Sequence, residues 1–220
     1  MLISHKHKFI TVDIPKTGTR SLRETLWEEN KVADVIGMPY DGNKNPLKQH
    51  ASILDIEAGF KENEWTGFSD YYKYSVVRNP WDRYFSFFKY YKMLADEHTP
   101  YKEYPNSIAF AQGEWAFNFF RERSISKVME TLINNNLAQS TFLLDRDGVC
   151  RFDRITRFEN LLQGFKGFCH DVGIGSFELN HANKTPTSLY KDDILTQSHI
   201  DMIAEKEEWV IDRFNYDYKG

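Results

Sequence analysis

A strand-like segment runs directly into a glycine-containing turn and a helix near the start of this chain. Residues 8–14 (KFITVDI) are apolar and β-branched, and Pro15 ends the run, as expected of a short buried strand. Leu22 and Leu26 lie four residues apart among charged residues, which predicts a helix over 19–30. The turn between them, PKTGTRS, therefore begins a helix, where unpaired backbone N–H groups and the helix dipole favour an anion.

The side chains of this turn are those of a phosphate-binding loop. Gly18 lets the backbone approach a phosphate closely, and Lys16 adds a positive charge. Three further residues supply hydroxyl groups: Thr17, Thr19 and Ser21. The turn is not a Walker A loop, which has four residues between its glycines and ends in Gly-Lys-Ser/Thr. A helix capped by Thr19 after a strand is the structural alternative that this segment leaves open.

A second strand also ends in residues suited to an anion. Residues 72–78 (YKYSVVR) are strand-like, Asn79-Pro80 stops them, and a helix is expected over 81–95. Arg78 would lie at the C-terminal end of this strand, where open α/β sheets bind ligands, and arginine can hold a phosphate by two parallel hydrogen bonds. Ser86, about two helical turns later, could point to the same anion. An exposed Arg78 beside a solvated helix start is the alternative.

Strands alternate with helices along the chain, which predicts an α/β fold with a parallel sheet in one domain, 1–220. Further helices are expected over 107–121, 124–135, 159–172 and 197–214, with Gly173 as a C-terminal cap. Short strands are expected over 141–144 and 154–157, with a turn at 145–148 between them. Loops are expected over 39–46, 98–106 (a candidate lid) and 175–190.

Composition excludes several classes of protein. The formal net charge of −4 gives no support to a nucleic-acid partner, because domains that bind nucleic acid are usually basic. No apolar run approaches the ~20 residues of a membrane span, and residues 1–8 lack the apolar stretch of a signal peptide, so we expect a cytoplasmic protein. Cys150 and Cys169 form no CxxC pair and cannot make a zinc site alone. We expect two reduced thiols, although a pairing between them stays open.

Taken together, the two segments resemble the donor-binding motifs of the sulfotransferase family. PKTGTRSL at 15–22 is similar to the family's 5′-phosphosulfate-binding motif, and RNPWDRYFSFF at 78–88 to its 3′-phosphate-binding motif, in fitting order and separation. Weaker similarities continue downstream, so that the resemblance extends over nearly the whole chain: Gln139-Ser140 with Phe142-Leu143, RITRFENL at 154–161, HANKT at 181–185 and Phe214-Asn215-Tyr216. The carbohydrate sulfotransferases of the heparan and dermatan/chondroitin, uronyl-type, branch resemble the chain most.

This resemblance implies a fold, a donor and a set of binding residues. The fold would be three-layered and P-loop-like, with a central, mainly parallel sheet flanked by helices. The donor would be 3′-phosphoadenosine 5′-phosphosulfate (PAPS), used without a metal. Residues carried over to the 5′ sulfo-phosphate end are Lys16, Thr17, Gly18, Thr19 and Ser21. Arg78 and Ser86 would hold the 3′-phosphate, and Lys184 and Thr185 would cover the nucleotide. Arg20 departs from the family's small residue and would face either solvent or an anionic acceptor.

The same resemblance points to a catalytic base. His50, in KQHAS between the two donor motifs, occupies the stretch where the uronyl-type branch has its catalytic histidine. An imidazole with a pKa near ~6.5 suits removal of a hydroxyl proton at neutral pH. His181 is the second candidate, and Glu57 and Glu62 are weaker ones. Lys16 would stabilise the charge that builds on the leaving 3′,5′-bisphosphate.

Two other functions remain compatible with the sequence. A P-loop-type nucleotide kinase would need Mg²⁺ and usually an aspartate at a strand end, where this chain offers Arg78. A non-catalytic nucleotide-binding module would keep the donor motifs but not need the base. The acceptor of a sulfotransferase would be a hydroxyl compound, expected to be a carbohydrate. Aromatic residues near the candidate lid could stack on a sugar: Tyr90, Tyr91, Tyr101 and Tyr104.

Overall fold

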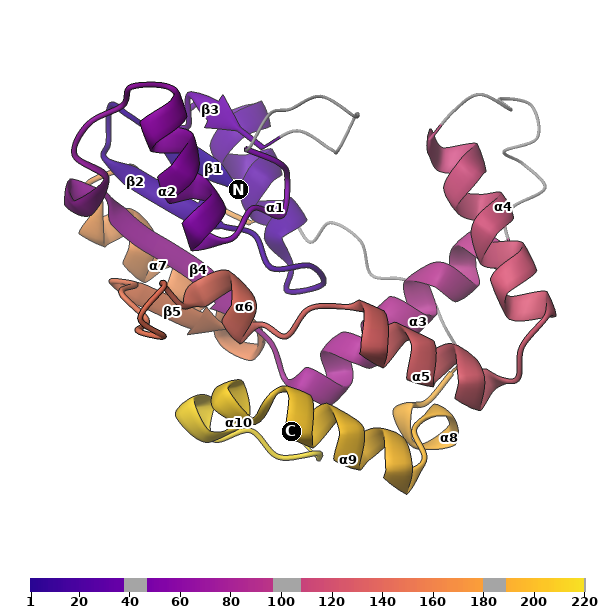
Figure 1. The fold of residues 1–220 in the computed structure, drawn as a ribbon. Coiled ribbons are helices and arrows are strands. Elements are labelled where there is room, and N and C mark those ends of the chain that lie inside the picture. The colour runs from indigo at the N-terminus through magenta and orange to yellow at the C-terminus, as the bar shows by residue number, and fades with distance from the viewer. Residues whose placement is uncertain (38–46, 97–107, 180–188, 220) are drawn as a thin grey trace. The chain divides into compact units, whose positions relative to one another are not determined.

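The structure is a computed structural model that describes residues 1–37, 47–96, 108–179 and 189–219 (Figure 1). The chain divides into two compact units. The first comprises Met1–Arg78 and Ala138–Ala182, and the second comprises Asn79–Leu137 and Asn183–Gly220. The predicted loops at 39–46 and 98–106, and much of the one at 175–190, lie outside the described residues.

The first unit is built on a sheet of five strands. They are β1 (Leu2–Ser4), β2 (Phe9–Val12), β3 (Val35–Ile36), β4 (Tyr72–Val77) and β5 (Arg154–Arg157), in the spatial order β3-β1-β2-β4-β5. β2, β4 and β5 run parallel, whereas β1 is antiparallel to both of its neighbours, β2 and β3. The sheet is therefore mixed rather than mainly parallel as predicted, because the N-terminal residues turn back on β2 as an additional strand.

The parallel part of the sheet brings the two candidate anion-binding segments together. Phe9 of β2 pairs with Tyr72 of β4, and Val12 pairs with Ser75, so both strands end at the same edge. The residues that follow β2 begin with Asp13, and Arg78 follows β4 directly. Carboxyl ends of adjacent parallel strands are where ligands bind in open α/β sheets.

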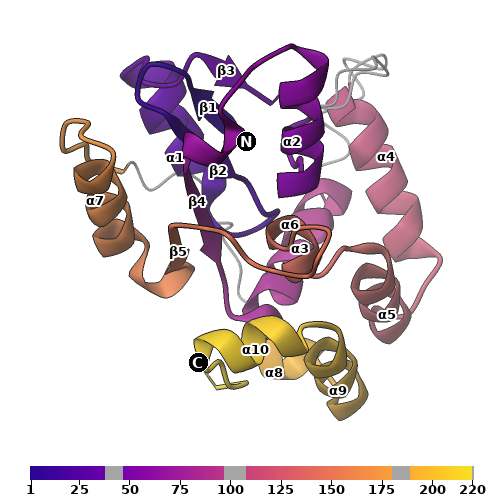
Figure 2. The same ribbon diagram turned by 60° about the vertical axis from the view of Figure 1, so that its left-hand side comes forward.

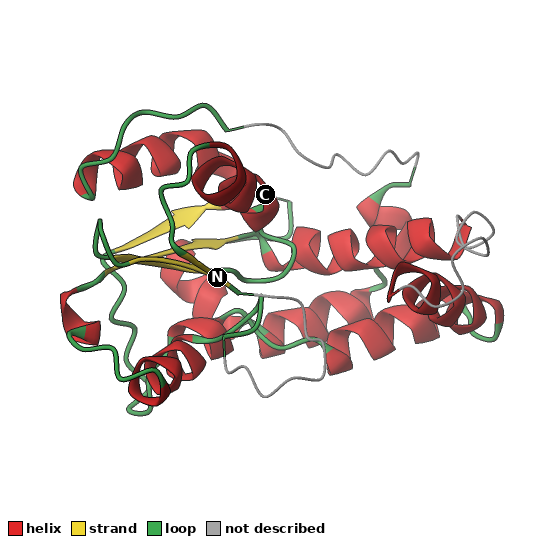
Figure 3. Ribbon diagram, turned by 90° about the horizontal axis from the view of Figure 1, so that it is seen from above, coloured by secondary structure: helices red, strands yellow, loops and turns green. Residues whose placement is uncertain are grey.

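Helices cover both faces of this sheet. α1 (Thr19–Arg23), the π-helical turn η1 (Glu24–Glu29) and α7 (Leu161–Asp171) lie on one face, and α2 (Ile53–Glu62) lies on the other with α6 (Ser140–Leu143) beside it (Figures 2 and 3). Two short 3₁₀ turns, η2 (Phe68–Asp70) and η4 (Phe158–Asn160), precede β4 and α7. Leu22 and Leu26, the predicted apolar stripe, are buried against Phe168 and its neighbours. The unit is thus a mixed α/β structure with helices flanking the sheet.

The second unit is helical in the residues that the structure describes. Its elements are α3 (Pro80–Asp96), α4 (Ile108–Arg121), α5 (Ile125–Asn135), α8 (Lys191–Ile194), α9 (Gln197–Lys206) and α10 (Glu208–Phe214). Arg83 of α3 and Glu207 form a fully buried ion pair at 2.7 Å, and Arg83 also donates to the carbonyl oxygen of Leu137 at 3.0 Å. This ion pair ties α3 to the junction between α9 and α10.

The predicted helices and strands are confirmed in most places and wrong in three. The strand predicted over 141–144 is the single helical turn α6, because Leu144 alone pairs, in one bridge with Cys150. The helix predicted over 197–214 is two helices that meet at Glu207. Residues 1–8, in which no strand was predicted, contain β1. Among the described residues, no helix is long and apolar enough to cross a membrane.

Candidate active site

The turn after β2 has a backbone shape that only a few residue types adopt without cost. Lys16 has φ 69° and Gly18 has φ 81°, both in the left-handed region. A Cβ atom on Gly18 would lie 2.7 Å from the ring of Phe158, so both the conformation and the contact require glycine there. Lys16 has no such freedom, and a left-handed conformation costs a non-glycine residue roughly 1–2 kcal/mol. Strain of this kind tends to be kept at ligand sites.

No side chain caps the first turn of α1. Gly18 is the N-cap of α1, and no side chain accepts a hydrogen bond from the helix start. The alternative in which Thr19 caps the helix is therefore wrong. The hydroxyl of Thr17 donates to the carbonyl oxygen of Ile14 at 2.9 Å and is fully buried, so this side chain holds the turn together. Thr19 and Ser21 are buried in the same turn.

Arg78 contacts this turn directly. Its Nη1 donates to the carbonyl oxygen of Lys16 at 3.1 Å, and its guanidinium lies over the ring of Phe158 at 4.5 Å. Phe158 is thus in contact with both Gly18 and Arg78. The two segments that the sequence singled out separately meet at one site.

Gln139 fixes the backbone of Arg78. Its Oε1 accepts from the Arg78 N–H, and its Nε2 donates to the Arg78 carbonyl oxygen, both at 2.9 Å. Gln139 is fully buried, so these bonds are shielded from water. The amide therefore acts as one more β-strand partner at the end of β4 and determines where the Arg78 side chain begins.

His50 is held by the residue that leads into the turn. Its Nδ1 lies 2.8 Å from the carbonyl oxygen of Asp13. A carbonyl oxygen only accepts, so Nδ1 carries the proton and the lone pair of the neutral ring is on Nε2. In the part of the chain that the structure describes, no protein group hydrogen-bonds Nε2. This is the tautomer that a base acting through Nε2 needs.

The surroundings of His50 favour its neutral form. Burial lowers the pKa of His50 below its usual value, and the positive charges of the N-terminal ammonium group and of Arg23 lower it further. The hydrogen bond to Asp13 and the charge of that residue oppose the shift without reversing it. The imidazole is therefore unprotonated at neutral pH, with a lone pair available to accept a proton.

The remaining predicted site residues fall into three groups. Ser86 is half-buried on α3 in the second unit, and its contact with a 3′-phosphate stays a prediction. Lys184, Thr185 and the second candidate base, His181, lie outside the described residues. Glu57 is paired with Lys61 at 3.0 Å, and Glu62 is exposed.

Outside this site, another histidine is close to a serine but is arranged differently. His199 Nε2 lies 3.2 Å from Ser126 Oγ, and its Nδ1 accepts from the Thr196 N–H at 3.2 Å. Because Nδ1 is the acceptor, Nε2 carries the proton and cannot take one from the serine. The pair is a structural contact within the second unit.

Two residues of the site, Gln139 and Phe158, were not assigned a role from the sequence. Both lie in segments that resemble the family, QS at 139–140 and RITRFENL at 154–161, so similarity alone marked their positions. Their contacts depend on β5 and α6 folding back to the end of β4, which no local pattern predicts. The two cysteines are free, and Cys169 is buried in the core of the first unit.

Comparison with known proteins gives a family match over nearly the whole chain. The profile of the Sulfotransferase family matches residues 1–217. No curated protein sequence shows significant similarity to the chain. A crystal structure of a sulfotransferase from Alicyclobacillus acidocaldarius aligns with 96% of this chain and 97% of its own, at 13% identity and a TM-score of 0.41. A likeness with so low a TM-score supports no conclusion about this protein.

Proposed function

Because the chain belongs to the sulfotransferase family, we propose that it transfers a sulfuryl group from PAPS to a hydroxyl of a carbohydrate acceptor. The observation that carries this proposal is that His50 and Arg78 both bind to backbone carbonyl groups of residues 13–16 in the first unit. There, Asp13 holds His50 and the carbonyl oxygen of Lys16 accepts from Arg78. A base, a cationic turn and an anion-binding arginine are thus held by one short segment.

The turn is suited to the phosphate end of the donor. No side chain caps the start of α1, which leaves that end of the helix open to an anion, and Lys16 adds charge. We assign the 5′ sulfo-phosphate end to Lys16, Thr17, Gly18, Thr19 and Ser21. Thr17 would act through its backbone, since its hydroxyl donates to Ile14.

Arg78 is assigned to the 3′-phosphate, with Ser86, Lys184 and Thr185 as further proposed contacts. The Gln139 amide holds the Arg78 backbone, and the Phe158 ring holds its guanidinium, so the side chain is already oriented before a ligand arrives. Orientation in advance reduces the entropy lost on binding.

In the proposed reaction, Nε2 of His50 takes the proton of the acceptor hydroxyl while the hydroxyl oxygen bonds to sulfur and the bond between sulfur and the 5′-phosphate oxygen of the donor breaks. Lys16 and the N–H groups of the turn stabilise the negative charge that builds on the leaving phosphate oxygen. The protein contributes position and charge, without a covalent intermediate, and we expect no requirement for a metal.

The experiment that tests this function measures donor binding first and turnover second. Calorimetry should show binding of the product analogue 3′,5′-adenosine bisphosphate, and labelled PAPS with a panel of sugars should show sulfated product in the presence of EDTA. His50→Ala should leave the affinity for the bisphosphate near wild type and lower turnover by ~10²–10⁴, the usual contribution of a general base.

Each outcome separates one alternative. Activity that disappears with EDTA and returns with Mg²⁺ would favour a nucleotide kinase. Tight binding without turnover on any sugar would favour a nucleotide-binding module. Unchanged turnover in His50→Ala would place the base elsewhere, and His181→Ala would be the next variant.

A further inference from the structure

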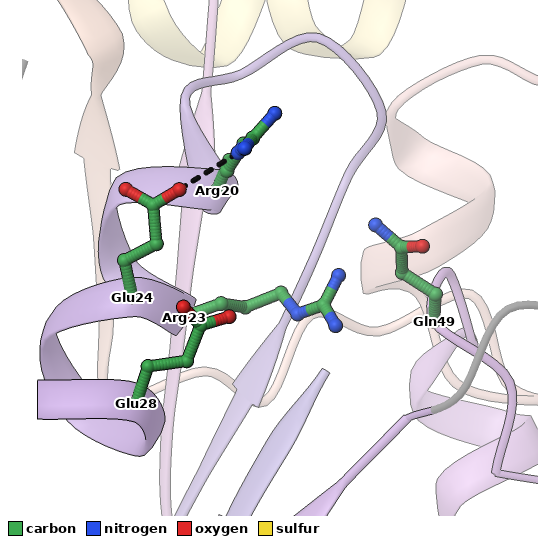
Figure 4. A pocket seen from close by; sticks show the side chains of 5 residues that line it. All are labelled: Arg20, Arg23, Glu24, Glu28 and Gln49. Atoms are coloured by element: carbon green, nitrogen blue, oxygen red, sulfur yellow. Dashed lines mark hydrogen bonds and ion pairs between the residues drawn. The ribbon is translucent and has the colours of Figure 1, made fainter. Parts of the chain in front are cut away.

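A pocket of about 310 Å³ lies beside α1 in the first unit. Its lining residues come from α1, η1 and the turn before α2: Arg20, Arg23, Glu24, Glu28 and Gln49 (Figure 4). Gln49 precedes the candidate base His50 in the chain. The pocket is therefore lined by the immediate neighbour of the candidate base, and none of the donor-binding residues lines it.

The two arginines of the pocket differ in their partners. Arg20 Nε pairs with Glu24 at 2.7 Å, four residues later, and its side chain is 67% exposed. Arg23 has Trp27 at the corresponding position, and it forms no ion pair within the described ranges. Its Nε is buried without a hydrogen-bond partner. Arg20 thus faces a carboxylate of its own helix, while Arg23 extends toward Gln49 (Figure 4).

A half-buried guanidinium without an anion is costly, because burial weakens its hydration and nothing replaces it. A ligand that brings a carboxylate or sulfate group would satisfy it, and a guanidinium can hold either group by two parallel hydrogen bonds. The Gln49 amide adds a neutral donor on the opposite side of the pocket.

We propose that Arg23, together with Gln49, binds an anionic group of the acceptor, a carboxylate or a sulfate, and thereby places the neighbouring hydroxyl at His50. This inference rests on the proposed function and names the class of acceptor that the site selects. Arg23 is then a specificity-determining residue. Its charge also acts on His50, where it lowers the pKa of the imidazole, so the two residues lie within electrostatic range.

The carboxylates of the pocket affect how tightly an anionic acceptor would bind. Glu24 is neutralised by Arg20, but Glu28 is exposed at the pocket and not paired among the described residues. Its charge should weaken binding of an anion. Glu28→Gln is therefore expected to tighten binding of an anionic acceptor, and to leave a neutral one unchanged.

The test compares two sugars that differ at one group. Methyl β-D-glucuronide carries a carboxylate where methyl β-D-glucopyranoside carries a hydroxymethyl group. Each is titrated into protein saturated with 3′,5′-adenosine bisphosphate, so that the donor site is occupied, and binding is followed by NMR. Wild type should bind the glucuronide at least about tenfold more tightly, as expected for a charge-assisted contact.

Variants assign that preference to Arg23. Arg23→Ala should abolish it without changing bisphosphate affinity or the melting temperature greatly, and Arg23→Lys should keep part of it. Lys61→Ala, which removes an exposed cation of α2 that is paired with Glu57, is the matched control and should change nothing.

Three results would overturn the inference. Wild type without a charge preference refutes it, and so does Arg23→Ala with the preference intact. A variant that moves only the pH–rate profile would show that Arg23 acts on His50 and not on the acceptor. Failure to bind the bisphosphate at all would instead refute the proposed function, which distinguishes the two.

Discussion

Replacement of Gln139 tests whether the end of β4 is held in place for binding. Gln139→Ala removes two buried hydrogen bonds of 2.9 Å and leaves the N–H and the carbonyl oxygen of Arg78 without these partners. Each buried, unsatisfied backbone group costs about 1–3 kcal/mol. We therefore expect the free energy of unfolding to fall by about 2–4 kcal/mol, since the structure around the cavity can relax to some extent.

This loss should appear as a lower melting temperature. With an unfolding entropy of about 2.1 cal/mol/K per residue, a chain of 220 residues has roughly 0.46 kcal/mol/K in total. The expected shift is then about 4–9 °C, measurable by calorimetry. Because Arg78 loses its anchor, the affinity for 3′,5′-adenosine bisphosphate should also fall, by about tenfold at a temperature where the variant is fully folded.

Ser75→Ala is the matched control. Ser75 lies in β4 and donates one buried bond of 2.8 Å to the carbonyl oxygen of Val12, without touching Arg78. It should lower stability by roughly 1–2 kcal/mol and leave bisphosphate affinity unchanged. If Gln139→Ala loses stability but binds the bisphosphate like wild type, Gln139 supports the fold only, and the argument that it positions Arg78 is wrong.

Four further variants or conditions test the rest of the structure. Arg78→Ala should lower the affinity for 3′,5′-adenosine bisphosphate at least about tenfold and that for 5′-AMP much less; equal losses in calorimetry would show that Arg78 does not recognise the 3′-phosphate. Because burial lowers the pKa of His50, kcat/KM should be the same at about pH 6.5 as at neutral pH, and it should decline only when the pH falls to the lowered pKa of the imidazole. An NMR titration that gives His50 a pKa at or above about 6.5 would contradict this. Lys16→Gly relieves a left-handed backbone and should leave the urea midpoint equal or higher while turnover falls by ~10²–10³; near-normal kcat would remove Lys16 from the mechanism. Glu207→Gln leaves the charge of Arg83 buried without its ion-pair partner, and urea unfolding should show a loss of about 3–5 kcal/mol; a loss below about 1 kcal/mol would mean that water reaches the pair.

The elements that sequence predicts well are those whose signal is local and long. Residues 72–77 form a strand because β-branched and aromatic residues end at Asn79-Pro80, and α3 begins at that proline, where its missing N–H costs nothing. The predicted left-handed cap at Gly173 is also found, with φ 66°. These features need only neighbouring residues to form.

The elements that sequence misses depend on distant partners. β1 has only three residues, and it is a strand because Leu2 and Ile3 pair with β2 on one side and β3 on the other. α6 has four residues, too few to show a helical period, so its apolar run looked like a strand. Short segments take the conformation that the surrounding structure imposes.

The candidate site divides in the same way. Gly18 was predictable because a turn between a strand and a helix needs a residue without a side chain, and the structure adds the reason that Phe158 fills the space. The place of His50 followed from family resemblance, whereas the carbonyl oxygen of Asp13 that sets its tautomer is a contact across 37 residues. No spacing rule connects positions so far apart.

Arg20 and Arg23 differ in the partners that their own helix offers them. Arg20 stood out because it departs from the family motif, and an anionic acceptor was one of its expected partners. The sequence also held the opposing evidence, since Glu24 lies four residues after Arg20 and such pairs form on one helix face. Arg23 has Trp27 at the same spacing, so its own helix offers no carboxylate to pair with its charge. On this reasoning, an arginine beside a phosphate-binding turn is available to a ligand when its own helix offers it no carboxylate.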